Sequence, residues 1–254
     1  MLTIEHLTKT YGGSAHKAVD DLNLTLKAGE IYGFLGPNGA GKTTTIKIVT
    51  GILQYGEGKI TVCGHDLRSD TIEAKRHIGY VSDSHILYDK LTGREYVNFL
   101  ADIYGVDVAT RKKRAEALLE KFELTNAYDS QIKTYSHGMK QKINIIGALI
   151  HDPDLWILDE PMTGLDPQSS FCLKELMRAH CEAGKTVFFS THVLEVAEKI
   201  CDRVGIIVKG KLLLEGTLDE IKAAKGDQSL EEVFLSVAGA EETAVHTEKA
   251  GEHA

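Results

Sequence analysis

A glycine-rich stretch between two apolar runs has the residue types needed to bind phosphate. Residues 31–35 form an apolar run typical of a buried strand, and residues 45–49 are typical of the start of a helix. The stretch between them matches GxxxxGK(S/T), the pattern of a phosphate-binding loop (P-loop) in its strand–loop–helix context. Its residues are Gly36, Pro37, Asn38, Gly39, Ala40, Gly41, Lys42, Thr43 and Thr44.

The chemistry of this loop fits the phosphate chain of a nucleotide. Its glycines let the backbone curl so that successive N–H groups point at one anion, and the following helix adds the positive end of its dipole. Lys42 can reach the β- and γ-phosphates, and the Thr43 hydroxyl is placed to bind Mg²⁺. The bare pattern arises by chance in roughly one chain in a hundred of this length, and its strand and helix lower that figure. We therefore expect nucleotide binding.

Two adjacent carboxylates follow a second apolar run. Asp159 and Glu160 come directly after residues 155–158. We expect Asp159 to hold Mg²⁺, directly or through water, and Glu160 to polarise the water that attacks the γ-phosphate. An apolar run that ends in two carboxylates is common by itself. It becomes informative because it follows a P-loop, with a helical block between the two.

Composition and charge exclude several classes of protein. The chain has 254 residues, 43% hydrophobic and 26% charged, which is ordinary for a globular protein. Its formal net charge of −8 argues against a nucleic-acid surface. No signal-peptide pattern is present, and the longest apolar run, at 143–150, falls short of the roughly 20 residues that span a bilayer. We expect a soluble chain that reaches a membrane only through a partner.

The four cysteines show no CxxC spacing, so neither a zinc site nor a disulfide framework is predicted from them. We expect free thiols in a reducing compartment. They are Cys63, Cys172, Cys181 and Cys201.

Apolar patterns indicate an α/β core interrupted by helices. Helix-forming residues dominate from about residue 91 to about 150, and strand patterns return afterwards. A turn that carries an aromatic ring is expected at residues 9–13. The predicted strands are residues 2–4, 22–26, 31–35, 59–62, 78–81, 155–159 and 185–190, with a hairpin over 203–214.

The residues between the two sites resemble those of the ATP-binding cassette (ABC) proteins. Residues 135–142 resemble the LSGGQ signature of that family, and residues 161–167 resemble the D-loop that follows the second carboxylate. His192 stands where the family has its switch histidine, and Tyr11 where it has an aromatic that stacks on adenine. The resemblance covers residues 1 to about 238 in the family's order and spacing.

This resemblance implies an α/β fold: a P-loop NTPase (RecA-like) core with an N-terminal antiparallel β part and an inserted α-helical subdomain. ATP and Mg²⁺ are the implied cofactors. The expected divisions are residues 1–88 and 151–218 for the nucleotide-binding core, 89–150 for the helical subdomain with the signature, 219–238 for a C-terminal helical extension and 239–254 for a disordered tail.

The resemblance also implies a dimer in which two cassettes pack head to tail. Each ATP then lies between the P-loop of one chain and the signature of the other. In that arrangement Ser136 supplies a hydroxyl, Gly138 a backbone N–H, and the helix that they open a positive dipole end. Asp166 of the D-loop contacts nucleotide or caps the helix that begins near Pro167, and the two roles are compatible.

Three positions depart from the family pattern. His137 and Met139 replace the first Gly and the Gln of the signature. Asp83 stands where the family has a Gln that helps to bind Mg²⁺ and reports the γ-phosphate to the helical block. A carboxylate there binds Mg²⁺ more strongly but repels phosphate oxygens. The alternative, that Asp83 faces water, is equally favoured.

Three rings also have structural alternatives to their family roles. Tyr11 would otherwise cover the core from a turn, and His192 would be a buried histidine at a strand end. The polar run 190–192 after an apolar strand favours the γ-phosphate contact for His192. For His137, a packed or solvent-facing ring is favoured over a pH-sensing one.

The expected function is that of an ATPase subunit of an ABC transporter. It would act as a homodimer, or with a paired ABC subunit, beneath a separately encoded permease at the cytoplasmic face of the membrane, without nucleic acid. Residues 230–234 and the absence of a further regulatory domain resemble export-type subunits, which move drugs, antimicrobial peptides or lipid-like molecules. The alternatives are a soluble ABC ATPase that acts on ribosomes or DNA and a regulatory module that holds ATP without turnover.

Overall fold

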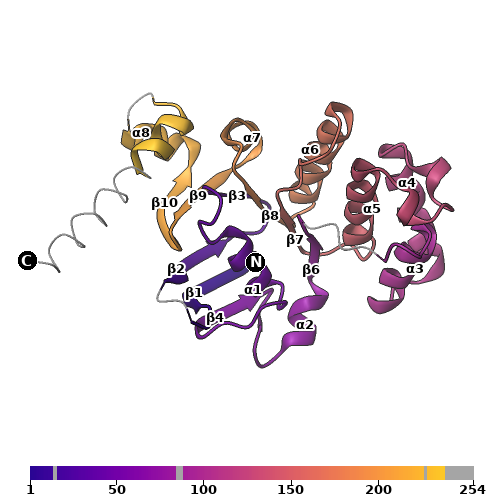
Figure 1. Ribbon diagram of the computed structural model, residues 1–254, viewed down its shortest axis with the longest axis horizontal. Coiled ribbons are helices and arrows are strands. Elements are labelled where there is room, and N and C mark those ends of the chain that lie inside the picture. The colour runs from indigo at the N-terminus through magenta and orange to yellow at the C-terminus, as the bar shows by residue number, and fades with distance from the viewer. Residues whose placement is uncertain (14–15, 84–87, 226–227, 238–254) are drawn as a thin grey trace, which may run out of the picture.

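Two β-sheets and a group of helices make up the computed structural model, which describes residues 1–13, 16–83, 88–225 and 228–237 (Figure 1). One sheet has four strands in the order β2-β1-β4-β5, and the other has six in the order β10-β9-β3-β8-β7-β6. The tail expected at residues 239–254 lies outside the described residues.

The four-stranded sheet is antiparallel. It consists of β1 (Leu2–Thr10), β2 (Lys17–Leu26), β4 (Glu57–Val62) and β5 (His65–Asp66). The turn expected at residues 9–13 begins later than predicted, because Lys9 and Thr10 belong to β1 and pair with β2. Register shifts along β1 break its apolar alternation, which is why its length was not evident from periodicity.

The six-stranded sheet holds the apolar runs. Its strands β3 (Ile31–Leu35), β6 (Ile78–Val81), β7 (Leu155–Asp159), β8 (Thr186–Thr191) and β9 (Arg203–Val208) are parallel, and β10 (Lys211–Thr217) is antiparallel to β9. Residues on both faces of the central strands are buried, so these strands are continuous apolar runs. Because the strands are parallel, the segments after β3, β7 and β8 all emerge at one edge of the sheet.

Helices occupy the end of the molecule beyond β6 and β7, as Figure 1 shows for α3, α4 and α5. These are α3 (Gly93–Ile103), α4 (Val108–Lys121) and α5 (His137–Leu149), with short 3₁₀ turns at Thr125–Ala127 and Ile132–Thr134. The others are α1 (Lys42–Val49), α2 (Thr71–Arg76), α6 (Pro167–Glu182), α7 (Leu194–Ile200), α8 (Leu218–Lys225) and a helical segment at 230–237. Helix α2 was not predicted, since six residues are too few to show a helical period.

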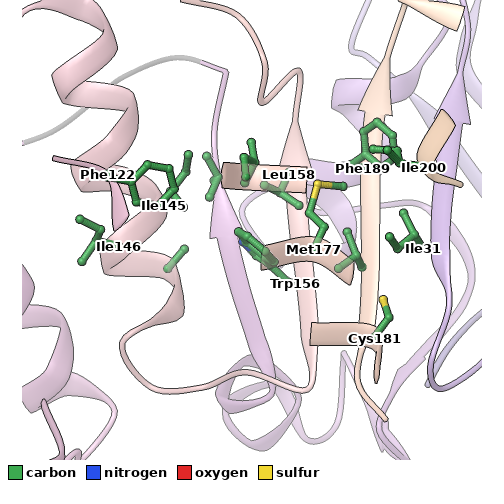
Figure 2. Close-up of a cluster of buried hydrophobic side chains, with 14 of the residues drawn as sticks. Ile31, Phe122, Ile145, Ile146, Trp156, Leu158, Met177, Cys181, Phe189 and Ile200 are labelled. Carbon is green, nitrogen blue, oxygen red and sulfur yellow. The ribbon is translucent and has the colours of Figure 1, made fainter. Parts of the chain in front are cut away.

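Strand β7 lies between two hydrophobic cores. Trp156 and Leu158 point into the core that joins the sheet to the helices, where Figure 2 shows them near Ile145 and Met177. Leu155 and Ile157 belong to the second core, beneath the four-stranded sheet. Both faces of the strand are therefore fixed by packing, and the carboxyl end of β7 has a defined position.

Strand β3 packs closely against β9 and against Cys201, which lies just before it. A Cβ atom on Gly33 would lie 2.6 Å from the Cys201 Sγ and 3.3 Å from the Val204 Cγ1. Cys201 is itself buried, and burial raises the pKa of its thiol well above the usual value. Only a hydrogen atom fits at position 33 without movement of its neighbours.

We therefore expect Gly33→Ala to lower the free energy of unfolding by about 1–3 kcal/mol, the usual cost of overpacking a core. Cys201→Ala, which removes the clashing sulfur, should recover part of this loss in the double variant. Urea unfolding of the two single variants and the double variant measures the coupling. Gly12→Ala is the control, because a Cβ there meets nothing within 4 Å. Equal costs at positions 33 and 12 would contradict the packing argument.

Candidate active site

The P-loop lies at the carboxyl end of β3, pressed against neighbouring backbone. A Cβ atom on Gly36 would collide with the carbonyl oxygen of Ile207, and one on Gly41 would lie 2.5 Å from that of Ala18. Gly41 also has a φ of 110°, which side chains strongly disfavour. The pattern therefore requires glycine at both positions for reasons of space and conformation.

Backbone hydrogen bonds hold the loop in place. The Gly210 N–H, in the turn between β9 and β10, donates to the Ala40 carbonyl at 2.8 Å, and the Asp20 N–H donates to the Gly210 carbonyl at 2.9 Å. Residues 37–39 at the tip of the loop remain exposed. The loop thus presents its tip to solvent from a fixed base.

Lys42 places a positive charge inside the loop. Its side chain is only 6% exposed, and its Nζ donates to the carbonyl oxygens of Gly36 at 2.6 Å and Pro37 at 3.2 Å. The Oε1 of Glu160 lies 3.6 Å from the same Nζ. A buried ammonium held mainly by neutral carbonyls is suited to an anionic ligand.

Asp159 is a buried carboxylate with one oxygen uncommitted. Its Oδ1 accepts hydrogen bonds from the Ser190 Oγ at 2.6 Å and the Thr43 Oγ1 at 3.3 Å. Its Oδ2 is buried without a hydrogen-bond partner in the described part of the chain. Burial raises the pKa of Asp159, the two hydroxyls oppose this, and the charges of Asp83 and Glu160 raise the pKa further.

This donor set fits Mg²⁺. A hard cation prefers carboxylate and hydroxyl oxygens, and Asp159 and Thr43 present both beside the P-loop. A buried carboxylate oxygen without a partner costs free energy unless a ligand satisfies it. The residues are therefore those expected of a cation site next to a phosphate site.

Ser190 connects the two acidic residues, and its role was not anticipated. It is fully buried in β8, opposite Asp159 of β7. Its hydroxyl donates to Asp159 and accepts from the Glu160 N–H at 3.1 Å. The signal available in the sequence was a hydroxyl residue at the end of an apolar strand, which is weak until the pairing of β7 with β8 is known.

Glu160 is aimed by an unusual backbone conformation. It follows β7 with a φ of 49°, a left-handed value that is costly for a residue other than glycine. Its Oε2 lies 3.0 Å from the Nδ1 of His192, which follows β8. Its Oε1 is buried without a hydrogen-bond partner among the described residues. The carboxylate is thus held between His192 and Lys42 with one oxygen available to a water molecule.

Tyr11 lies at the border of the P-loop. Its hydroxyl is 3.3 Å from the Thr44 Oγ1, and the Lys9 Nζ lies 5.5 Å from the centre of its ring. The ring is 46% exposed. The alternative in which Tyr11 covers the core is therefore not what the structure contains, and its ring is accessible beside the loop.

Asp83 follows β6 and is exposed. Its negative charge contributes to the raised pKa of Asp159 and to that of Tyr80, which burial raises to about 12. Asp83 is therefore both solvent-facing and close to the acidic residues, so the two alternatives considered for it are compatible.

The signature residues lie apart from the P-loop of the same chain. Helix α5 packs against β6, whereas the P-loop follows β3, with β8 and β7 between those strands. Ser136 is exposed and caps α5 by accepting the Met139 N–H at 3.2 Å. Gly138 lies in the first turn of that helix, and a Cβ on it would lie 2.9 Å from the Gly164 carbonyl oxygen of the D-loop.

Asp166 is a helix cap in this structure. Its Oδ1 accepts the Ser169 N–H at 2.8 Å at the start of α6, and its Oδ2 lies 3.1 Å from the Nζ of Lys142 on α5. These contacts, of which those with Ser169 are the stronger, hold the pKa of Asp166 well below its usual range. Asp166 therefore joins the D-loop to the signature helix.

In the described part of the chain, no helix has the length and apolar character needed to cross a membrane.

Comparison with known proteins identifies relatives along most of the chain. The family model for ABC transporters matches residues 19–163. The linearmycin resistance ATP-binding protein LnrL of Bacillus subtilis is 40% identical over 242 residues, 95% of this chain and 76% of that protein. The daunorubicin/doxorubicin resistance ATP-binding protein DrrA of Streptomyces peucetius is 38% identical over 224 residues, 88% of this chain and 67% of that protein.

Solved structures agree with these relatives. An ATP-binding subunit of an ABC transporter superposes with a TM-score of 0.89 at 33% identity, covering 93% of this chain and 99% of that one. A dimeric ATP-binding cassette bound to ADP and Pi superposes with a TM-score of 0.78 at 28% identity, covering 86% and 99%. The fold class and the family resemblance inferred from the sequence are confirmed. The chain therefore belongs to the ABC transporter family, as an ATP-hydrolysing cassette.

Proposed function

We propose that the chain binds ATP with Mg²⁺ in a dimer and powers a separately encoded export permease. The observation that carries this proposal is the convergence of Lys42, Asp159 and Glu160 at the carboxyl edge of one parallel sheet. A polyphosphate, a cation and an activated water molecule each have a suitable partner there.

The P-loop and its neighbours bind the nucleotide. The N–H groups of the loop and of the first turn of α1 surround the phosphates, and Lys42 neutralises their charge. The exposed ring of Tyr11 stacks on adenine beside the loop. Thr43, Asp159 and Asp83 would hold Mg²⁺, directly or through water. The ion would offset part of the phosphate charge and so reduce the repulsion that opposes attack.

Glu160 serves as the general base. Its Oε1, which accepts no hydrogen bond from the described residues, takes a proton from water as the water oxygen bonds to the γ-phosphorus and the bond to the β-phosphate oxygen breaks. The proton then passes from Glu160 to the inorganic phosphate that has formed. His192 holds the other oxygen of Glu160, so its role is to position the base and to contact the γ-phosphate. A module that only stored ATP would not need this pair.

The exposed start of α5 completes a second chain's site. Ser136 and Gly138 present a hydroxyl and an N–H at a helix N-terminus, which is suited to an anion but lies away from the P-loop of its own chain. A homodimer, or a pair with a similar subunit, brings this helix start to the γ-phosphate of its partner. The related cassette with ADP and Pi is dimeric, which supports this arrangement.

An apolar surface at the start of the helical block is the proposed contact with the permease. A pocket of about 550 Å³ is lined by Tyr88, Leu91, Phe99 and the two residues 89–90. Tyr88 and Phe99 are both exposed, and their rings meet edge to face with centroids 5.6 Å apart. Exposed apolar rings of this kind mark interaction surfaces. In the sequence Tyr88 follows Asp83 by five residues, so this surface is close along the chain to the proposed cation site.

The proposed cargo is a drug-like or lipid-like compound moved outward at the cytoplasmic membrane. Two of the relatives are named for resistance to linearmycin and to daunorubicin and doxorubicin. The residues that suggested an export-type ending are helical, and Leu230 and Val233 are buried in the main core. That ending is thus part of the packed fold.

Glu160→Gln tests the catalytic role. The change keeps shape but removes the base, so turnover should fall on the order of 10²–10⁴-fold while ATP binding persists through Lys42, Thr43 and Asp159. With ATP–Mg²⁺ the variant should elute as a dimer in size-exclusion chromatography, and as a monomer without nucleotide.

A second substitution tests which surface forms the dimer. Adding Ser136→Arg to Glu160→Gln should return the protein to monomer, because the larger side chain enters the partner's phosphate site. Adding Glu120→Arg, on the exposed face of α4, should leave the dimer intact. A slow Glu160→Gln variant that stays monomeric at saturating ATP would keep the catalytic assignment but exclude the sandwich dimer.

Asp159→Asn tests whether the buried carboxylate destabilises the free protein and is needed to bind Mg²⁺. A raised acid pKa costs folding stability above the folded pKa, and this cost disappears once the pH falls below the unfolded pKa. Without nucleotide, the variant should therefore raise the free energy of unfolding at pH 7, by an amount that shrinks as the pH falls. It should also lose Mg²⁺-dependent ATP binding. Urea unfolding and calorimetry measure the two effects.

Asp66→Asn is the opposite control for this experiment. The Ser69 and Arg68 N–H groups lower the pKa of Asp66, so its ionised form stabilises the fold above the unfolded pKa. This variant should lower stability at pH 7. If Asp159→Asn also lowers the free energy of unfolding, the ionised carboxylate of Asp159 does not destabilise the protein in the absence of nucleotide.

Phe99→Glu tests the permease surface. A charge in the apolar pocket should reduce recovery of the chain with membranes that contain its permease, while the ATPase activity of the isolated chain stays near the parent value. Val108→Glu is the matched control, since Val108 is an exposed apolar residue at the start of α4. Equal membrane recovery of the two variants would refute the assigned surface.

A further inference from the structure

Three side chains with metal-binding atoms meet at the edge of the sheet opposite the nucleotide site. Cys63, His77 and Asp154 each offer one ligand atom, and these atoms lie within 4.8 Å of one another. His77 directly precedes β6 and Asp154 directly precedes β7, and the Leu155 N–H donates to the His77 carbonyl at 2.9 Å. Strand β7 therefore has this cluster at its amino end and Asp159 at the other, about 16 Å away.

The imidazole of His77 is held in one orientation. Its Nδ1 lies 2.5 Å from the Oδ2 of Asp154, and its ring stacks on that of His65 with centroids 5.3 Å apart. His65 is in turn held by Asp70, whose Oδ2 is 2.5 Å from its Nδ1. This contact places the two ligand atoms side by side, and a cation bound by His77 Nδ1 and Asp154 would take the place of the proton between them. The stacked ring of His65 then keeps the His77 ring in this orientation.

Cys63 is presented to this pair by a strained turn. Cys63 and Gly64 connect β4 to β5 with φ values of 50° and 90°. Positive φ at both central residues defines a type I′ turn, where Asn, Asp and Gly are the usual residues. A cysteine held in this conformation is an outlier of the kind that accompanies functional sites. The residue is only partly buried, so a cation can reach it from solvent.

We propose that Cys63, His77 and Asp154 bind one Zn²⁺ ion, at a site separate from the nucleotide. Thiolate, imidazole and carboxylate are the ligands that Zn²⁺ takes in proteins, and three of them leave a fourth position for water. Ideal tetrahedral zinc places such atoms roughly 3.5 Å apart, so a pair at the 4.8 Å limit would have to approach by about 1 Å. Mg²⁺ prefers an all-oxygen set and does not compete.

A bound ion would connect the two sheets. Cys63 belongs to the β4–β5 hairpin of the antiparallel sheet, whereas the other two residues precede strands of the parallel sheet. A thiol binds Zn²⁺ as the thiolate, so binding at Cys63 displaces its proton. The ligands are far apart in the chain, which is why their spacing indicated no zinc site.

Co²⁺ provides a spectroscopic test on the untagged full chain with reduced thiols. One equivalent should produce a thiolate-to-cobalt charge-transfer band and the intense visible bands of tetrahedral Co²⁺, and Zn²⁺ should remove both. Cys63→Ser should abolish the charge-transfer band, and His77→Ala should weaken Zn²⁺ binding by at least about 10²-fold. Cys172→Ser, which changes another partly buried thiol, should leave the spectrum unchanged.

The outcomes separate this site from others. Cobalt bound at the nucleotide site would show no thiolate band, because Thr43, Asp159 and Asp83 supply only oxygen. Absence of the band in the parent protein, or its persistence in Cys63→Ser, would overturn the proposal. The Met1 Sδ lies 3.0 Å from the Cys63 Sγ, and thioethers suit Cu⁺, so binding of Cu⁺ without Zn²⁺ or Co²⁺ would also overturn it. Retained ATPase activity in Cys63→Ser and His77→Ala would establish that both fold.

Discussion

The parallel direction of β3, β7 and β8 is the constraint on which the active site depends. Each of these strands ends in a different functional group, and only parallel neighbours bring all three ends to the same edge. The register is specific as well, because Asp159 pairs with Ser190 and the hydroxyl of that serine reaches both acidic residues. The site is thus a consequence of strand pairing, and the loops add to a geometry that the sheet has already set.

Local sequence was enough to predict the parts of the site whose chemistry is local. The P-loop needs its glycines for space and conformation, and these needs are visible as a pattern. The apolar strands were evident for the same reason, since burial on both faces leaves no polar position. Ser190 and the Cys63 cluster were not evident, because their roles arise from residues distant in the chain. Strand β1 was underestimated where register shifts disturb its alternation.

The site holds two costly features side by side. Asp159 carries a charge in a buried position, and Glu160 adopts a left-handed backbone conformation. Neither helps the free chain to fold, and both are maintained by the two cores that grip β7 from opposite faces. The free energy gained from hydrophobic packing of β7 thereby offsets the cost of the buried charge and of the left-handed backbone. This explains why residues 155–158 of β7 are all apolar, whereas the strand ends in a buried carboxylate.

The outward-facing start of α5 has a kinetic consequence. A chain that supplies a phosphate-binding helix to its neighbour, and takes one in return, has a site whose completion is bimolecular. For free chains in the proposed dimer, specific activity would then rise with protein concentration. On a permease that carries two such chains, each chain meets the other at an effective concentration. The distance between the two docking positions sets that concentration, whatever the concentration of protein in solution. ATP consumption would thus be confined to assembled transporters, and unassembled chains would be largely idle without any inhibitor.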